Sequence, residues 1–391
     1  MPKRTTLEID INEYQFRNRA LRMNKAYTEQ NYQSSTILTD DVFPYIEFYF
    51  TGHKKNIKYT NPMLKPQYGD PKQYHYSFYW KQATIFYNAA KELPIEASPL
   101  ASYYCMLNAA KAYIVFRSHT ADDFVEYLGR HGLCEDKGHT GENLDTIYVK
   151  RQKGKTVFQK FGNLLEPNFD ALWAQGDSWS LKKLLYNLAY LHRAYVTTYT
   201  KPRGKKIVEQ FIPLNTGNAP AYHKGNDGNL YLLIGLDRKF FPNSITMLPS
   251  VVSASVADAF YVDPNNRFTL ISKHGARRNS DSISKELKDL NKELRRKFQY
   301  IKSTKRLWYL KQTGLNSPDI LNVNSMLISM AVMHRFSEIV RYKPEQLARL
   351  MQSEENWLIH EFLTLALDQF IDEIAAEITG QEIMSTGVKA E

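Results

Sequence analysis

The chain has little cysteine and no long apolar run. Its 391 residues contain two cysteines, which excludes a disulfide framework and favours a reducing compartment. No stretch approaches the roughly 20 consecutive apolar residues of a membrane-spanning helix, and the first residues lack the apolar segment of a signal peptide. We therefore expect a cytoplasmic protein with no membrane partner.

Several motifs of known chemistry are also missing. The chain has neither Gly-x4-Gly-Lys-Ser/Thr nor Gly-x-Gly-x-x-Gly, the glycine-rich loops that hold phosphate groups. It has no Gly-x-Ser-x-Gly turn of a serine hydrolase and no His-Glu-x-x-His of a zinc protease. His131, Cys134 and His139 are spaced too loosely for a paired zinc motif. No metal and no cofactor is predicted.

The composition is that of a folded protein with a basic surface. Hydrophobic residues make up 43% and aromatic residues 13%, so the chain can bury two or three cores. The formal net charge of +10 favours a polyanionic partner. The charge is equally compatible with a partner protein or with a homo-oligomer.

The periodicity of apolar residues predicts a mainly α-helical bundle with a small antiparallel β-sheet, inserted or appended (α+β overall). Residues 1–200 are expected to form an N-terminal helical region, 201–280 a small β region, and 281–391 a C-terminal helical region packing on the first. Helices are predicted over 13–30, 74–92, 98–117, 180–196, 323–342 and 357–378. Strands are predicted over 206–212, 230–236, 259–262 and 268–272, with a turn at 226–229 and short extended pieces at 146–150 and 156–161.

The helix predicted after residue 97 carries polar groups on an otherwise apolar surface. Ser98 is expected to be its N-cap and Pro99 to occupy its first turn. Tyr104, Asn108 and Lys111 follow at spacings of four and three, which places them on one stripe. Buried hydroxyl, amide and ammonium groups need partners, supplied by the protein or by a ligand. The stripe is either part of a ligand site or an internal hydrogen-bond network.

A basic segment lies between Lys285 and Lys311. It contains ten Lys/Arg and three Asp/Glu, a net charge of +7, and apolar residues recur through it at helical spacing. One interpretation is a solvated amphipathic helix; the other is a helix that presents its cations to nucleic-acid phosphates. The candidate phosphate contacts are Arg295, Arg296, Lys297, Lys302, Lys305 and Arg306.

Two further arginines are candidates for chemistry. Arg341, followed by Tyr342, ends the most apolar predicted helix, where it either complements the helix dipole or meets an anionic ligand. Arg267 and His274 match the Arg-x6-His spacing of helical ribonucleases, although they flank a predicted strand. His131, His274 and Arg267 are therefore the catalytic candidates if the protein is an enzyme.

Three segments in order resemble the bacterial YaaC-like family. Pro99–Ala112 resembles that family's P-L-x-x-Y-Y-x6-K-A helix, and His131-Gly132 with Gly154 and Phe158 resembles its His-Gly and Gly-x-Phe segments, here stretched. Phe336–Pro344 resembles its L-S-x-x-x-R-Y-x-P helix end, with phenylalanine in place of leucine. The resemblance spans about residues 75–380, and it implies little about function because the family is largely uncharacterised.

The helix around Tyr103-Tyr104 and Lys111-Ala112 is also similar to a core helix of HEPN-type helical domains. That resemblance implies a nucleotide- or nucleic-acid-binding module or effector in bacterial stress response or antiphage (antiviral) defence. The expected ligand-binding residues are Tyr104, Asn108, Lys111, His131, Arg341 and Tyr342. One alternative is a metal-independent ribonuclease, although this chain lacks a convincing helical Arg-x4–6-His. The other is a structural or partner-binding protein without a ligand.

Overall fold

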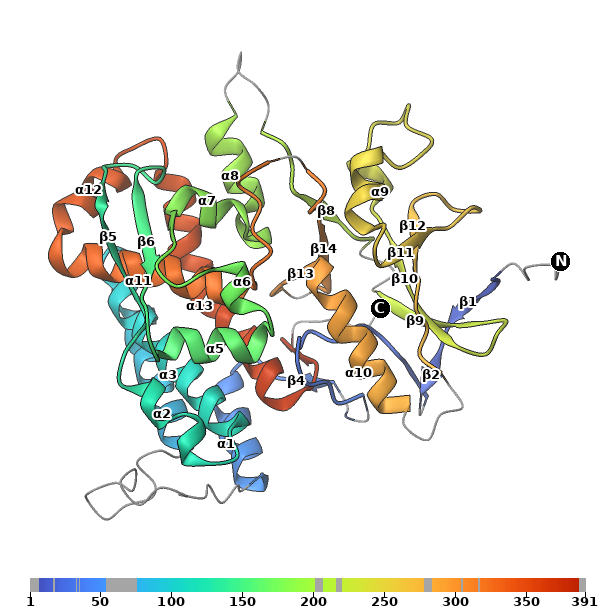
Figure 1. The fold of residues 1–391 in the computed structure, drawn as a ribbon, viewed down its shortest axis with the longest axis horizontal. Helices are drawn as coiled ribbons and strands as arrows, with labels where there is room; N and C mark the ends of the chain where they lie inside the picture. Colours follow the sequence, from blue (N-terminus) through green and yellow to red (C-terminus); the bar gives the residue numbers. More distant parts are fainter. Residues whose placement is uncertain are drawn as a thin grey trace. The chain divides into compact units, whose positions relative to one another are not determined.

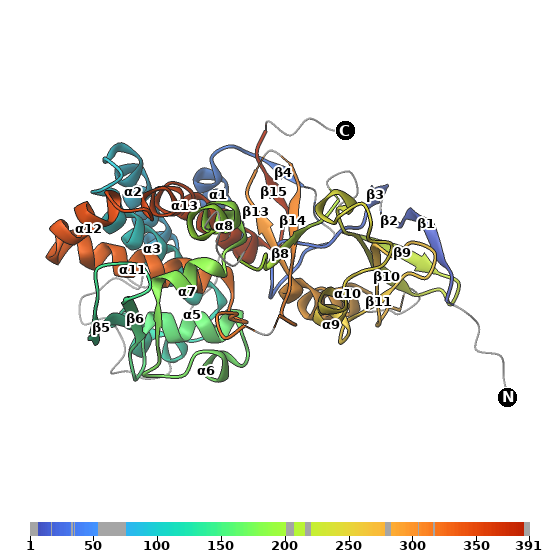
Figure 2. The same cartoon turned by 90° about the horizontal axis from the view of Figure 1, so that it is seen from above.

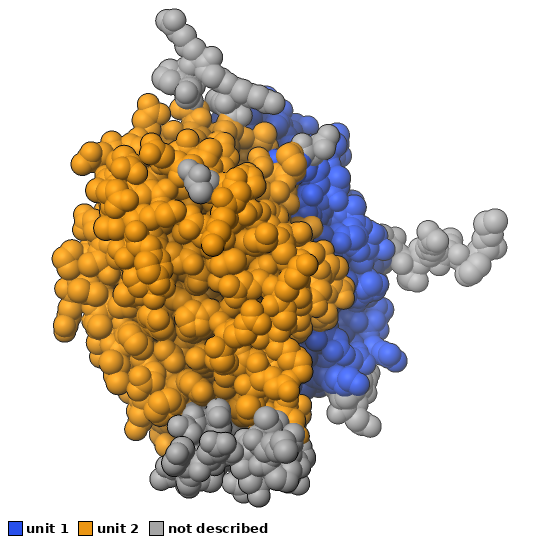
Figure 3. Space-filling view, turned by 60° about the vertical axis from the view of Figure 1, so that its left-hand side comes forward, with its two compact units in different colours: residues 1–38, 209–317, 380–391 blue, residues 39–208, 318–379 orange. Residues whose placement is uncertain are grey.

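The computed structural model describes residues 7–16, 18–32, 34, 36–53, 76–200, 207–215, 220–277, 283–303, 305–315 and 317–386 (Figure 1). Contacts within the chain divide it into two compact units, coloured separately in Figure 3. Unit 1 comprises Met1–Leu38, Glu209–Ser317 and Gly380–Glu391, and unit 2 comprises Thr39–Val208 and Pro318–Thr379. These units do not coincide with the three consecutive regions 1–200, 201–280 and 281–391.

Unit 2 is the helical unit, organised around one buried helix, α3. The main helices are α1 (Val42–Gly52), α2 (Tyr76–Glu92), α3 (Ser98–Arg117), α5 (Val157–Leu165), α11 (Ser325–Tyr342), α12 (Pro344–Met351) and α13 (Asn356–Thr379). Helix α3 packs against α2, α5, α11 and α13, and Figure 2 shows α2 beside it. Its alanines Ala109, Ala110 and Ala112 are fully buried, which lets neighbouring helices approach closely.

The beginning of α3 differs in detail from the prediction. Ala97 is the N-cap, and Ser98 is the first helical residue, with Pro99 in the first turn as expected. The Ser98 hydroxyl donates a hydrogen bond to the Ile95 carbonyl at 3.1 Å instead of accepting one from the helix. The N-cap prediction for Ser98 is therefore wrong by one residue.

Helix α11 is central in unit 2, as its apolar composition predicts. The Asn324 side chain caps it by accepting a hydrogen bond from the Met326 amide at 2.9 Å. Its residues are buried on nearly every side, and the chain turns at Lys343 into α12, which begins with Pro344. Within the described residues, no helix is long and apolar enough to cross a membrane.

Two local predictions in unit 2 are wrong. Residues 156–161 are not extended: Thr156 caps α5 by accepting a hydrogen bond from the Gln159 amide. The helix predicted over 180–196 is interrupted between α7 (Leu181–Tyr186) and α8 (His192–Tyr199). The Asn187 amide donates to the Lys183 and Asp319 carbonyls, which fixes the chain at the break. A three-stranded sheet of β5 (Leu133–Thr140), β6 (Ile147–Arg151) and β7 (Ser178–Ser180) completes the unit.

Unit 1 contains most of the β structure. Its largest sheet has the order β1-β9-β10-β12-β11, antiparallel throughout, formed by Ile9–Glu13, Ala221–Gly225, Leu230–Gly235, Thr269–Ser272 and Phe260–Val262. The predicted turn at 226–229 joins β9 to β10, where Gly228 has φ +85° and the Gly225 amide donates to the Asn229 carbonyl. A second sheet pairs β13 (Phe298–Ile301), β14 (Leu307–Lys311) and β8 (Phe211–Pro213). The predicted strand 206–212 begins in residues outside the described part.

The predicted fold class, a mainly helical bundle with one small sheet, is wrong. The described residues form fifteen strands in five sheets beside the helices, a mixed α+β fold. The predicted helix at 13–30 is absent, because this segment pairs as β1, β2 (Gln15–Phe16) and β3 (Arg19–Ala20) and then continues without helix. Its apolar spacing fits a helix, but its hydrogen-bond partners lie some 200 residues away, in β9.

The basic segment does not form one long helix. Helix α10 (Ile283–Leu294) ends where a short 3₁₀ turn (Arg295–Lys297) leads into β13 and β14. Phe298 and Tyr300 therefore alternate along a strand and are buried with Leu294 in the apolar core of unit 1. The candidate cations at 295–306 consequently do not share one helical face.

Candidate anion site

In unit 2, two cationic side chains act electrostatically on His131. Burial lowers the pKa of His131, and the positive charges of Lys111 and Arg341 lower it further. Lys111 comes from the middle of α3, Arg341 from the end of α11, and His131 from the loop before β5. The fold therefore brings together three of the six predicted ligand-binding residues from segments up to 230 positions apart.

Aromatic rings form a wall of packed side chains beside His131. Tyr103 contacts both imidazoles, with its ring centroid 5.6 Å from that of His131 and 4.8 Å from that of His334. The centroids of His131 and His334 are 6.5 Å apart, and Tyr104 lies 6.1 Å from His131. Tyr103 is 2% exposed, and its hydroxyl has no hydrogen-bond partner among the described residues. A buried hydroxyl without a partner is costly, so this wall offers a donor to a bound group.

His334 is held neutral. Burial lowers its pKa to about 3, and the charges of His131, Arg335 and Arg341 act in the same direction. The nearest oxygen of Glu338 lies 3.8 Å from His334 Nδ1, too far for a hydrogen bond. Glu338 instead accepts from Arg335 at 3.2 Å, although burial raises the pKa of the Glu338 carboxyl. Neutral His334 thus adds no charge to the site.

Neither Lys111 nor Arg341 has a counterion within the part of the chain that the structure describes. Lys111 Nζ lies 5.6 Å from the centroid of the Tyr79 ring, and burial lowers the pKa of its ammonium. The guanidinium of Arg341 lies over the exposed Tyr342 ring at 4.6 Å and forms no ion pair. Arg335 and Lys343, by contrast, both bind Glu135 at 2.7 Å. Lys111 and the exposed Arg341 therefore form no ion pair with a described residue, and the Glu338 carboxyl acts on Arg341 only at longer range.

Gly132 positions His131. It has φ +102°, a conformation that favours glycine, and an added Cβ would lie 2.3 Å from Thr156 Oγ1. The His131 carbonyl accepts from the Phe158 amide and the Arg130 carbonyl from the Val157 amide. The loop is thereby fixed to the start of α5, and the close approach of Thr156 explains the glycine after His131.

The remaining members of the predicted stripe have structural roles. The Asn108 amide donates to the Tyr104 carbonyl at 2.8 Å, so it is satisfied within its own helix. Tyr104 stacks on Phe86 at 5.3 Å while its ring edge faces His131. Sequence reasoning missed Tyr103 and His334, because only the packing of α3 against α11 brings their rings together.

The predicted nucleic-acid contacts at 295–306 are divided among several roles in unit 1. Arg295 is fully buried between the Tyr27 and Trp308 rings and donates to the Lys25 and Phe298 carbonyls. Lys297 pairs with Asp258 and Arg306 with Glu382. Arg296 and Lys305 are exposed, and Lys302 is partly buried. Arg295 is therefore a core residue and cannot contact a phosphate in this fold.

The other catalytic candidates do not form a site. Arg267 and His274 lie beyond opposite ends of β12 in unit 1, and both are exposed. The His274 ring faces Glu293 at 3.4 Å. Among the described residues, no group of three or more His, Cys, Asp or Glu side chains is arranged to hold a metal ion. The His139 ring instead stacks on Tyr148 and forms a hydrogen bond with Asp136.

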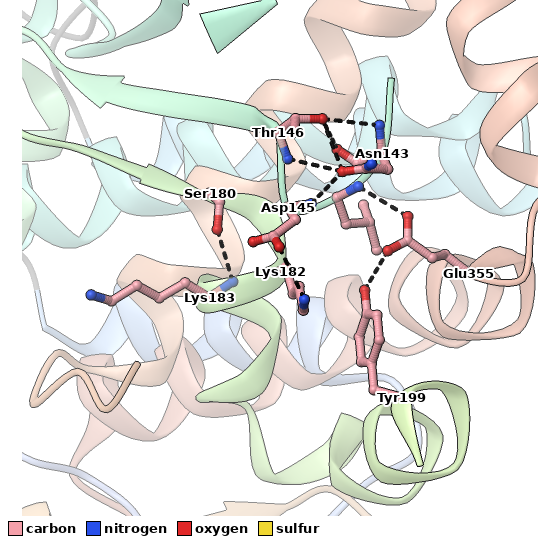
Figure 4. Close-up of polar contacts among 9 residues, drawn as sticks. Asn143, Asp145, Thr146, Ser180, Lys182, Lys183, Tyr199 and Glu355 are labelled. Carbon is pink, nitrogen blue, oxygen red and sulfur yellow. Dashed lines mark hydrogen bonds and ion pairs between the residues drawn. The ribbon is translucent and has the colours of Figure 1, made fainter. Parts of the chain in front are cut away.

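A second polar cluster in unit 2 is self-contained (Figure 4). Glu355 accepts hydrogen bonds from the Tyr199 hydroxyl and the Leu144 amide, and Lys182 pairs with Asp145 at 3.1 Å. Asn143 accepts from the Thr146 hydroxyl and amide. Because these groups satisfy one another, the cluster fixes the loop before β6 to α8 and needs no ligand.

Comparison with known proteins agrees with the family resemblance. A family model described as YaaC-like Protein matches residues 25–378, which is most of the chain. The chain therefore belongs to the YaaC-like family. No curated protein and no solved structure matches it.

Proposed function

We propose that unit 2 binds the phosphate group of a nucleotide or nucleic acid through Lys111, His131 and Arg341. The observation that carries this proposal is that two cations, Lys111 and Arg341, act electrostatically on the neutral His131. Neither cation forms an ion pair with a residue that the structure describes. Ammonium, guanidinium and imidazole N–H groups are the donors that recognise phosphate oxygens. The unpartnered Tyr103 hydroxyl supports the same proposal with an uncharged donor.

The wider biological role is a proposal that depends on this binding. Roles in bacterial stress response or antiphage defence are suggested by the similarity of α3 to HEPN-type helices, and the family match does not extend to them. Ribonuclease activity is the second candidate. It is favoured by the neutral His131 beside Arg341, since a neutral imidazole can accept a proton while a guanidinium stabilises a phosphorane-like charge.

The binding test uses fluorescence anisotropy with a labelled single-stranded RNA, the matching DNA, and ATP as competitor. Lys111→Met and Arg341→Met should each weaken binding about tenfold, and each should lower the salt dependence by roughly one ion. Lys137→Met and Arg193→Met are matched controls, because both residues are exposed in unit 2. The proposal fails if both site variants fold, by circular dichroism, and bind all three probes as the unchanged protein does.

A further inference from the structure

A cavity of about 290 Å³ lies entirely within unit 1. Its walls come from β2, β3 and the chain that follows them, with additional side chains from the β13–β14 connection and the C-terminal segment. The lining residues that matter here are Phe16, Arg19, Arg22, Tyr32, Arg306 and Glu382. None of them belongs to the site in unit 2.

The lining carries a net positive charge, although two of its three arginines are ion-paired. It contains three guanidinium groups and one carboxylate, that of Glu382. Arg306 binds Glu382 with two hydrogen bonds, from Nε at 2.9 Å and from Nη2 at 3.2 Å. Arg22 Nη2 binds Glu13, which lies outside the lining, at 3.2 Å. These pairs hold the side chains in place and leave a net positive charge on the cavity wall.

Many of the guanidinium donors remain unused. Each guanidinium carries five N–H groups. Arg19 uses one of its nitrogens, Nη1, to donate to the Ser34 carbonyl at 3.0 Å. Arg22 Nε is buried without a partner among the described residues, and Arg306 Nη1 makes no described hydrogen bond. A buried donor without a partner, such as Arg22 Nε, is unfavourable, and a multivalent oxyanion can accept from it and from the neighbouring guanidinium groups together.

Two aromatic rings, Phe16 and Tyr32, lie in the same lining. The Tyr32 hydroxyl lies 3.4 Å from that of Tyr222, with the two rings edge to face, so the Tyr32 ring is fixed. Burial raises the pKa of Tyr32, which keeps its hydroxyl neutral and adds no negative charge. A volume of about 290 Å³ is at the lower end for small-molecule sites and suits a ligand of the size of one nucleotide.

We propose that this cavity binds a nucleoside monophosphate: a phosphomonoester, carrying two negative charges, at Arg19, Arg22 and Arg306, with its planar base against Phe16 and Tyr32. The site is separate from the one in unit 2 and does not depend on it. The phosphate supplies the charge that the lining lacks, and the base supplies the apolar contact.

Isothermal titration calorimetry of the full chain with AMP tests this site. We expect one AMP per chain in unit 1, binding at least tenfold more tightly than adenosine or inorganic phosphate. Arg19→Met should weaken AMP binding tenfold or more. Because Arg19 is exposed, this variant should still fold. Arg22→Met, with a larger structural risk, should act in the same direction.

Matched controls separate the two sites. Arg267→Met removes an exposed arginine of unit 1 outside the cavity, and Lys111→Met disables the site in unit 2. Both should leave AMP binding to the unit 1 site unchanged. The proposal is overturned if AMP does not bind at millimolar concentration, or if Arg19→Met binds it normally. It is also overturned if inorganic phosphate binds as tightly as AMP, because the rings would then contribute nothing.

Discussion

The ring of Tyr103 meets the ring of His334 edge to face, with centroids 4.8 Å apart and planes at 80°. Tyr103 comes from α3 and His334 from α11, so this contact joins the two central helices of unit 2. The same burial that packs the rings keeps His334 uncharged. Because His334 is buried here, we expect the stability of unit 2 to depend on pH.

His334→Gln should reduce the pH dependence of stability. The folded-state pKa of His334, about 3, lies below the ordinary histidine value of about 6.5. As the pH falls below 6.5, the unfolded chain takes up a proton that the folded chain excludes, so stability is lost until the folded pKa is reached. The slope is about 1.4 kcal/mol per pH unit, or about 2 kcal/mol between pH 6.5 and 5. Urea denaturation at several pH values measures it.

This prediction is tested by comparing how steeply the unfolding free energy falls with pH in the variant and in the unchanged protein. His334→Gln removes the titrating group, so its unfolding free energy should fall less steeply below pH 6.5 than that of the unchanged protein. Equal slopes would show that His334 is protonated in the folded chain.

His131 should make ligand binding stronger at lower pH. Burial and the charges of Lys111 and Arg341 lower the pKa of its imidazole in the free protein, and a bound phosphate would raise it again. Binding should therefore take up a proton, and affinity for RNA or a nucleotide should rise as the pH falls from 8 to 6. Calorimetry in two buffers of different ionisation enthalpy measures the proton uptake, and His131→Asn should abolish it. An affinity independent of pH would remove His131 from the proposed site.

The sequence predicts the long helices of unit 2 well, and the shorter helices of unit 2 and much of unit 1 poorly. Helices α3, α11 and α13 were predictable because their apolar residues recur at helical spacing over many turns. These three helices also pack against one another. The strands β1 and β13 were not, because each is short; the two isoleucines of β1 are too few to form a pattern, and the apolar spacing of β13 continues that of a helix. Their identity depends on pairing with β9 and β14, which local periodicity does not contain.

The residues of the candidate site in unit 2 also differ in how well the sequence predicts their roles. Lys111 and Arg341 stand out in the sequence because a charged residue in an apolar helix needs a partner. Tyr103 and His334 look like ordinary core residues of their helices, and Gly132 looks like a loop glycine. Their roles follow from the approach of α3 to α11 and from the contact of the 130–132 loop with α5.

Gly132→Ala should destabilise the protein by about 2 kcal/mol or more. The backbone conformation at φ +102° is strained for alanine, and the new Cβ would collide with Thr156, which caps α5. Gly129→Ala is the matched control, because nothing lies within 4 Å of a Cβ at that position. It should change stability by less than about 1 kcal/mol. Similar thermal midpoints for the two variants would contradict the geometry described for the His131 loop.

Arg295→Met should destabilise unit 1 without a specific loss of nucleic-acid binding. The guanidinium is fully buried between Tyr27 at 3.9 Å and Trp308 at 4.8 Å, so its removal deletes two cation–π contacts. The Lys25 and Phe298 carbonyls also lose their donor. Together these losses should cost about 3 kcal/mol of unfolding free energy, measured by urea denaturation.

Lys305→Met is the control for Arg295→Met, because it removes an exposed cation from the same basic segment. It should leave the unfolding free energy within about 0.5 kcal/mol of its original value. RNA affinity of Arg295→Met, measured under conditions where it remains folded, should match that of Lys305→Met, since each loses one unit of positive charge. If Arg295→Met keeps full stability but loses binding far more than Lys305→Met, the arginine reaches a phosphate and the buried position described here is wrong.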